Sequence, residues 1–187
     1  MSKVLVCGSS YIRRLQDYVR ESHFHCRGKP VHWIGRPGAK IQTIWQELRR
    51  RPVLTYSVVV IMVGSNDLCN FSRRPADVTN DLLALSENLL SRGVTKVVIC
   101  QLLHRRSRSH FQGLRDVKEY NDRVDDTNNL LAEKCKGNVS FWTHEHGVRG
   151  RQHQCRDGIH LNAKGLKSFR YSIMNAMLKA EKSISRQ

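Results

Sequence analysis

One serine, one asparagine and an aspartate–histidine pair are the residues of this chain whose types and order could do chemistry. Ser10 follows a glycine and a second serine, Asn66 lies in a Gly-Ser-Asn-Asp segment, and Asp157 precedes His160 by three residues. A carboxylate at that spacing can orient an imidazole, and an oriented imidazole can take a proton from a serine hydroxyl. If folding brings these residues together, they supply the groups needed for acyl transfer.

Each of these residues also has a purely structural interpretation. Ser, Asn, Asp and Gly are ordinary turn residues, and a serine before an amphipathic segment can cap a helix. Gly38 precedes another amphipathic segment, where it would permit the backbone to approach a ligand or would simply make a turn. The elements that surround these residues decide between the two interpretations.

The stretch Val58–Val63 is an uninterrupted apolar run composed mainly of β-branched residues. A short run without polar alternation predicts a strand that is buried on both faces. The run ends abruptly at Gly64, and Asn66 follows directly. Ligands of open parallel sheets bind beyond the carboxyl ends of the strands. We therefore expect Asn66 at the edge of the sheet where chemistry is done.

Five short apolar runs alternate with amphipathic, helix-like segments. The predicted strands are Lys3–Cys7, Val31–Ile34, Val58–Val63, Thr95–Cys100 and Val139–Trp142. This alternation predicts a single three-layer α/β/α domain over residues 1–182, with a frayed tail at 183–187. Right-handed crossovers predict a five-stranded parallel sheet in the order 2-1-3-4-5. Strands one and three are neighbours in that order, so Ser10 and Asn66 should face each other.

The order of these blocks resembles the SGNH (GDSL-type) hydrolase superfamily, and the similarity extends from Lys3 to about Met177. It rests on Gly-Ser-Ser, the glycine turn, Gly-Ser-Asn-Asp and Asp-Gly-Ile-His-Leu-Asn in succession. The resemblance implies a serine esterase that cleaves a small carboxylic ester through an acyl-Ser10 intermediate, without a cofactor.

The resemblance also implies a role for each site residue. Ser10 would be the nucleophile, His160 the general base and then acid, and Asp157 the partner of His160. The N–H groups of Ser10 and Gly38 and the side chain of Asn66 would form the oxyanion hole.

One departure from the family pattern lies beside the nucleophile. The superfamily usually has Gly-Asp-Ser in its first block, and Ser9 occupies the place of that aspartate. A weaker similarity, through the basic surface and the expected intracellular character, is to SGNH domains encoded in animal LINE-type retrotransposons.

The net charge of +16, from 32 Lys and Arg against 16 Asp and Glu, indicates a second kind of partner. Such a surface attracts RNA or DNA by counterion release, and arginine suits bidentate contact with phosphate. The alternative function is therefore an SGNH-fold nucleic-acid-binding module with a weakened or inactive site. The predicted contacts are Arg49, Arg50, Arg51, Arg105, Arg106 and Arg108.

Histidine and cysteine also gather near the predicted catalytic histidine, which raises the question of zinc. The residues are His144, His146, His153, Cys155 and His160. Their spacings do not match the usual structural zinc sites, so no metal is predicted.

The spacing of the cysteines and the length of the apolar runs indicate the cellular compartment. The six cysteines are scattered without a paired motif, which is typical of reduced thiols in an intracellular protein. The apolar runs are too short for a membrane span or for the core of a signal peptide. We therefore expect an intracellular, cytoplasmic or nuclear protein without a signal peptide.

Overall fold

The computed structural model of the chain describes residues 3–19, 24–144, 148 and 150–185. The strands are β1 (Lys3–Gly8), β2 (His25–Cys26), β3 (Lys29–Gly35), β4 (Tyr56–Met62), β5 (Lys96–Cys100) and β6 (Val139–Trp142). The α-helices are α1 (Ser10–Val19), α2 (Ile41–Arg49), α3 (Pro75–Ser91), α4 (Val117–Lys134) and α5 (Ala163–Ile184). Two short 3₁₀ turns, η1 (Val53–Thr55) and η2 (Arg151–His153), lie between them.

The strands form one sheet in the order β2-β3-β1-β4-β5-β6. The five strands from β3 to β6 along this order are parallel to one another, and their arrangement confirms the predicted 2-1-3-4-5 order. The predicted count of five strands is wrong, because β2 adds a short antiparallel strand at one edge. β2 has only two residues, so no hydrophobic periodicity could reveal it.

A tight two-residue turn makes this extra strand. Arg27 and Gly28 both have positive φ angles, 50° and 75°, which match the hand of a twisted antiparallel hairpin. His25 and Cys26 then pair with Pro30 and Lys29 of β3.

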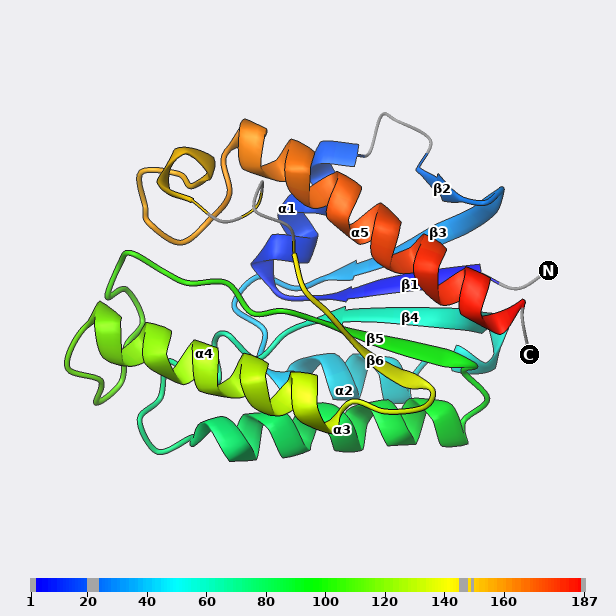
Figure 1. Cartoon of the computed structure of the whole chain (residues 1–187), viewed down its shortest axis with the longest axis horizontal. Coiled ribbons are helices and arrows are strands. Elements are labelled where there is room, and N and C mark those ends of the chain that lie inside the picture. The colour runs from blue at the N-terminus through cyan, green and yellow to red at the C-terminus, as the bar shows by residue number, and fades with distance from the viewer. Residues whose placement is uncertain (1–2, 20–23, 145–147, 149, 186–187) are drawn as a thin grey trace.

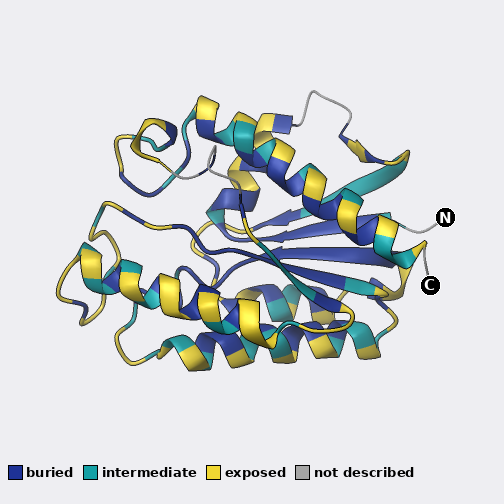
Figure 2. Cartoon of the chain, in the orientation of Figure 1, coloured by how far each residue is buried: buried dark blue, intermediate teal, exposed yellow. Residues whose placement is uncertain are grey.

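Alternate residues of the sheet pack against helices on its two faces. In β4, Val58 and Val60 face the apolar cluster of α1 and α5, whereas Val59 and Ile61 face that of α2, α3 and α4. Figure 1 shows these two helical layers on either side of the sheet. Figure 2 shows the buried central strands and the exposed outer sides of the helices. β4 is therefore buried on both faces, as the apolar run predicted.

The helices begin and end where their flanking residues favour it. α3 begins with a proline and is followed by Gly93 at φ 91°, a combination that starts and stops helices efficiently. The side chain of Asn162 accepts a hydrogen bond from the N–H of Gly165 and caps α5. α5 continues through Ile184, two residues into the segment predicted to be a frayed tail. None of the described helices is long and apolar enough to cross a lipid bilayer.

The six cysteines are free thiols, four of them buried. Burial raises the pKa of the Cys7 thiol to about 12. A thiol held neutral in this way acts as a small apolar side chain in the core rather than as a nucleophile.

Candidate active site

A sharp turn between β1 and α1 places Ser10 at the carboxyl edge of the sheet. The N–H of Ser9 donates to the carbonyl of Met62 in β4, and the carbonyl of Gly8 accepts from the N–H of Arg36 after β3. A Cβ atom at Gly8 would lie 2.1 Å from the Met62 carbonyl oxygen, so only glycine fits. Three neighbouring strands thereby fix the turn, and Ser10 becomes the first residue of α1.

The loop before α5 brings His160 to this serine. Nε2 of His160 lies 3.1 Å from Oγ of Ser10, across 150 residues of sequence. Nδ1 of the same ring lies 2.7 Å from Oδ2 of Asp157. Oδ1 of Asp157 accepts hydrogen bonds of 2.9 Å from the backbone N–H groups of Ile159 and His160. Carboxylate, imidazole and hydroxyl therefore form one continuous chain of hydrogen bonds.

The carboxylate of Asp157 determines which nitrogen of His160 carries the proton. Burial alone would raise the pKa of Asp157, but the hydrogen bonds from the imidazole and from two backbone N–H groups outweigh it and lower the pKa to about 2. An ionised carboxylate only accepts hydrogen bonds, so the proton of the neutral ring lies on Nδ1. Nε2 then presents its lone pair to the hydroxyl of Ser10.

Buried contacts hold the histidine loop against α1. The hydroxyl of Tyr11, which is 2% exposed, donates to the carbonyl of Ile159 at 2.6 Å. The N–H of Cys155 donates to the carbonyl of His160, and the N–H of Arg106 donates to the carbonyl of Gly158. The residue that directly follows Ser10 thus aligns the loop that carries its partner.

Three residues with available hydrogen-bond donors, Ser10, Gly38 and Asn66, line one pocket. Gly38 has a φ of 70°, a left-handed conformation that glycine adopts without strain. Among the described residues, neither the N–H of Gly38 nor that of Ser10 has a hydrogen-bond partner. The amide nitrogen of Asn66 donates one bond to the carbonyl of Ala39, which leaves its second N–H available. Donors arranged in this way can stabilise an anionic oxygen.

A buried arginine fixes the orientation of the Asn66 amide. Arg105 is 3% exposed, and its guanidinium donates to Oδ1 of Asn66 at 2.8 Å and to Sγ of Cys69 at 2.8 Å. The guanidinium lies 5.1 Å from the centroid of the Tyr120 ring. Because arginine can only donate, Oδ1 of Asn66 must face it and the amide NH2 must face Ala39 and the site. Arg105 therefore sets the direction of an N–H donor.

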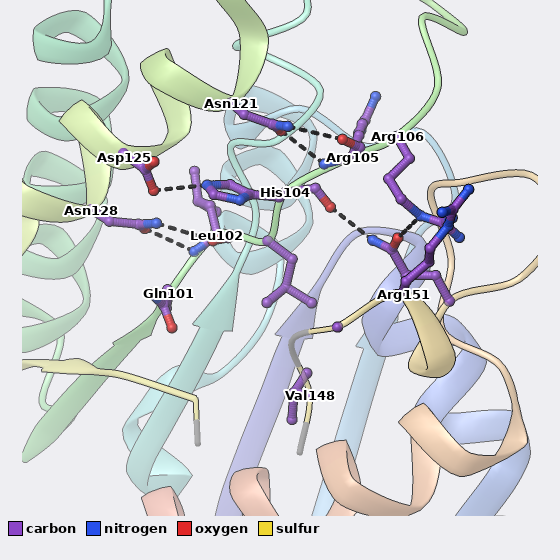
Figure 3. Close-up of a pocket in the computed structure, with 13 residues that line it drawn as sticks. Gln101, Leu102, His104, Arg105, Arg106, Asn121, Asp125, Asn128, Val148 and Arg151 are labelled. Carbon is purple, nitrogen blue, oxygen red and sulfur yellow. Dashed lines mark hydrogen bonds and ion pairs between the residues drawn. The ribbon is translucent and has the colours of Figure 1, made fainter. Parts of the chain in front are cut away.

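Helix α4 holds the segment that carries Arg105. The side chain of Asn121 accepts from the N–H of Arg105 and donates to its carbonyl, at 2.9 and 3.0 Å. Asn128, two turns further along α4, makes the same pair of bonds with the backbone of Leu102. Figure 3 shows both pairs of hydrogen bonds. Each asparagine side chain bonds to a backbone N–H and a backbone C=O of the segment, as the backbone of a neighbouring strand would.

Asp67 acts on the glycine turn rather than on the reacting groups. Its carboxylate accepts from the N–H of Ile41 at the start of α2, 3.2 Å from Oδ2. Burial raises the pKa of Asp67 to about 6, although this hydrogen bond opposes the shift. Asn66 and Asp67 thus attach the turn after β4 to the turn around Gly38.

These groups open into a pocket of about 390 Å³. Its lining includes Ser10, Gly38, Lys40, Asn66, Arg105 and His160. A second pocket of about 250 Å³ is lined by the segment that carries Arg105, by Asn121, Asp125 and Asn128 of α4, and by Val148 and Arg151 (Figure 3). The first pocket contains the groups suited to chemistry, and its size suits a small organic substrate.

The structure brings together all five residues that the sequence predicts for the catalytic set. They are Ser10, Gly38, Asn66, Asp157 and His160. Arg105, Tyr11 and Lys40 were not predicted to lie at this site. A tyrosine directly after the serine was a signal for Tyr11, but the burial of Arg105 depends on contacts far away in sequence.

The prediction that Arg105 belongs to an exposed nucleic-acid contact is wrong, because its guanidinium is buried against Asn66 and Tyr120. Its neighbours in the predicted loop, Arg106 and Arg108, are exposed. The arginine cluster at residues 49–51 is exposed as well, at the end of α2.

The histidine cluster considered for zinc is only partly described. His146 lies outside the described residues. His144 contacts Ser172, and His160 contacts Ser10 and Asp157. Within the described ranges, no group of three or more His, Cys, Asp or Glu side chains is placed to hold a metal ion.

Comparison with solved structures identifies proteins that share this fold. A Bacteroides fragilis protein provisionally classed as an acylhydrolase superposes with a TM-score of 0.78 at 16% identity, over 95% of this chain and 87% of its own. A GDSL-like lipase from Bacteroides thetaiotaomicron gives 0.71 at 17% identity, over 96% and 89% of the two chains. The lipase/acylhydrolase from Enterococcus faecalis gives 0.67 at 16% identity, over 96% of each. The shared feature is the fold of the GDSL-type hydrolases.

A comparison of the sequence with protein-family models identifies the family. Residues 3–167 match the model of the GDSL-like Lipase/Acylhydrolase family, and the chain therefore belongs to that family. No curated protein sequence matches the chain significantly.

Proposed function

We propose that this protein is a serine ester hydrolase that cleaves a small carboxylic ester through an acyl-Ser10 intermediate. The observation that carries the proposal is the chain of hydrogen bonds from Asp157 through His160 to Ser10, at the mouth of an open pocket. Membership of the acylhydrolase family supports the same reaction class.

The first half of the reaction acylates the serine. Nε2 of His160 takes the proton of the Ser10 hydroxyl as Oγ attacks the ester carbonyl carbon, and the carbonyl oxygen becomes an oxyanion. The N–H groups of Ser10 and Gly38 and the free N–H of Asn66 stabilise this oxyanion. The imidazolium, stabilised by Asp157, then gives its proton to the leaving alcohol as the carbon–oxygen bond breaks.

The second half releases the acid. A water molecule gives a proton to Nε2 of His160 and attacks the acyl carbon, and the same oxyanion hole stabilises the second tetrahedral intermediate. That intermediate collapses, Oγ of Ser10 takes the proton back, and the carboxylic acid leaves. The enzyme returns to its starting protonation state.

Ser9 does not prevent this assignment of Ser10. Ser9 is buried, and its backbone bonds to Met62 and Arg13 hold the nucleophile turn without a carboxylate at this position. We therefore expect an active enzyme despite the departure from the Gly-Asp-Ser pattern.

Covalent labelling tests the nucleophile directly. A fluorophosphonate should add to Ser10, because the imidazole activates its hydroxyl and the oxyanion hole accepts the phosphoryl oxygen. Intact-mass and peptide mass spectrometry should find one adduct, on the peptide that contains Ser10, and His160→Ala should lose it. An adduct on another residue, or equal labelling of the His160→Ala protein, would contradict the assignment.

We propose RNA or DNA binding as a second function, on the basis of the basic surface. The specific observation is that Arg49, Arg50 and Arg108 are exposed and have no ion-pair partner within the described part of the chain. Aromatic residues that could stack on bases are sparse near them in sequence, so we expect contact with phosphates rather than with base edges.

The salt dependence of oligonucleotide binding tests this second function. Each lost phosphate contact should reduce the slope of log K against log salt by about 0.7–0.9. We expect such a reduction for Arg49→Ala with Arg50→Ala, measured by fluorescence titration at several salt concentrations. The matched control is Arg115→Ala with Lys118→Ala, which removes the same charge from side chains already paired with Glu119 and Asp122. Equal slopes for both double variants, or no binding at low salt, would refute a defined phosphate contact.

A further inference from the structure

We infer that the ester substrate carries an anionic group, a carboxylate or a phosphate, in its acyl or alcohol part, and that Lys40 and Arg105 hold this group beside Ser10. This inference rests on the proposed esterase function and names the substrate class of the same pocket.

The charges that line the pocket are all of one sign. Lys40 and Arg105 contribute two cations, and His110 and His160 contribute imidazoles. No Asp or Glu lines the pocket within the described residues. The two carboxylates nearby in the fold, Asp67 and Asp157, are engaged by the N–H of Ile41 and by His160.

Arg105 is a buried cation without a buried anion to match it. It contacts an amide oxygen, a sulfur and an aromatic ring, and no carboxylate pairs with it within the described part of the chain. Its Nε atom is buried and has no hydrogen-bond partner among the residues that the structure describes. Buried charges are normally paired, and an unpaired one is costly. An anion in the pocket that Arg105 lines would supply the missing charge.

Two helix ends add to the positive potential of the pocket. α1 begins at Ser10, and α2 begins at Ile41 directly after Lys40. Both helices are at least nine residues long, and their amino ends carry partial positive charge. Lys40 is exposed and makes no ion pair with a described residue, so its ammonium group is available to a ligand.

The proposed anion site and the oxyanion hole recognise different parts of the substrate. The oxyanion hole acts on every ester, whatever its other substituents, because it contacts the reacting carbonyl oxygen. Lys40 is not among the proposed oxyanion-hole donors, so its charge acts on a part of the substrate other than the reacting carbonyl. The preference for an anionic ester over a neutral ester of the same shape therefore isolates the contribution of the cations.

Matched esters measure this preference. On the alcohol side, 4-acetoxybenzoate and 4-acetoxyphenyl phosphate are compared with neutral 4-acetoxybenzamide. On the acyl side, 4-nitrophenyl hydrogen adipate is compared with 4-nitrophenyl methyl adipate. Each kcat/KM is divided by the rate constant for hydrolysis of the same ester by hydroxide, which corrects for intrinsic reactivity. We expect at least about a tenfold preference for the anionic member of one pair at low salt, and a smaller preference at about 1 M salt, where charges are screened within a few ångströms.

The variant Lys40→Gln tests whether this preference arises in the pocket. The ratio of anionic to neutral kcat/KM should fall by about fivefold, the value of one charge pair at contact distance in water. Lys96→Gln is the matched control, since it removes the same charge at the amino end of β5, and it should leave the ratio unchanged. The ratio is used because damage to the catalytic groups affects both esters alike.

The outcomes separate this inference from the function on which it rests. If the wild type hydrolyses the neutral esters, the Ser10→Ala variant does not, and no anionic ester is preferred, the inference is wrong and the esterase proposal stands. An equal loss of preference in Lys40→Gln and Lys96→Gln would overturn the assigned binding site. If none of the esters is turned over, both proposals fail. The carboxylate and phosphate members of the alcohol series identify which anion the pocket prefers.

Discussion

Ester turnover by the Ser10→Ala variant is expected to fall by about 10⁶-fold in kcat, to the level of the residual reaction supported by the remaining oxyanion-hole donors and substrate binding. The methyl side chain of alanine cannot form the acyl intermediate, so the covalent route is lost. The fold should persist because Ser10 is partly exposed and its hydroxyl is hydrogen-bonded only to His160 among the described residues. Hydrolysis of a short 4-nitrophenyl ester, with the thermal unfolding midpoint as a check on folding, provides the measurement.

His160→Ala should reduce kcat about as much as Ser10→Ala, and the double variant should lose little more. The two residues act as one unit, so the loss of either disables the other and the effects do not add. Asp157→Asn should be less damaging, since the amide still contacts the imidazole but can favour the wrong tautomer. Unchanged hydrolysis by purified Ser10→Ala protein would disprove the nucleophile assignment. Additive losses in the double variant would show that the two side chains do not work together.

The arrangement of the parallel strands could be predicted because each strand carries its own signal in the sequence. The apolar run Val58–Val63 predicts a strand buried on both faces, and β4 is covered by helices on both. The handedness of crossovers then leaves few orders for the strands. β2 could not be predicted, because two residues in a hairpin carry no periodicity.

The candidate site likewise contains residues that the sequence could predict and one, Arg105, that it could not. Ser10 and Asn66 follow strands, and His160 precedes a helix. All three lie in short polar blocks that can be recognised from the sequence alone. Arg105 stands in a run of basic residues that is typical of an exposed loop, and only the contacts with Asn66, Cys69 and Tyr120 make it buried. Those partners lie on other elements, so no local pattern distinguishes Arg105 from its exposed neighbour Arg106.

The hydrogen bond from Arg105 affects how the Asn66 side chain is oriented. An asparagine amide can rotate by half a turn and exchange its donor for its acceptor. The bond from Arg105 to Oδ1 and the bond from Nδ2 to the carbonyl of Ala39 oppose that rotation, because the flipped amide would oppose donor to donor and acceptor to acceptor. We therefore propose that Arg105 is a positioning residue for the proposed oxyanion hole, besides its proposed contact with an anionic substrate.

Asn66→Ala is expected to lower kcat by about 10²–10³, the usual loss for one side-chain donor of an oxyanion hole. KM for a neutral ester should change little, because this hydrogen bond strengthens mainly in the transition state. Arg105→Met keeps the apolar stem and removes the guanidinium, and it should lower kcat in the same direction with KM again unchanged. Steady-state kinetics on a neutral acetyl ester measure both variants without involving the proposed anion site.

A double-mutant cycle between the two positions distinguishes positioning from a general loss of structure. If Arg105 acts by orienting the Asn66 amide, Arg105→Met should cost much less in the Asn66→Ala background than in the wild type, since there is no amide left to orient. A general destabilisation would cost the same in both backgrounds and would lower the thermal unfolding midpoint in parallel. If KM rises and kcat holds in the Asn66→Ala variant, Asn66 binds the substrate instead, and its place in the oxyanion hole is wrong.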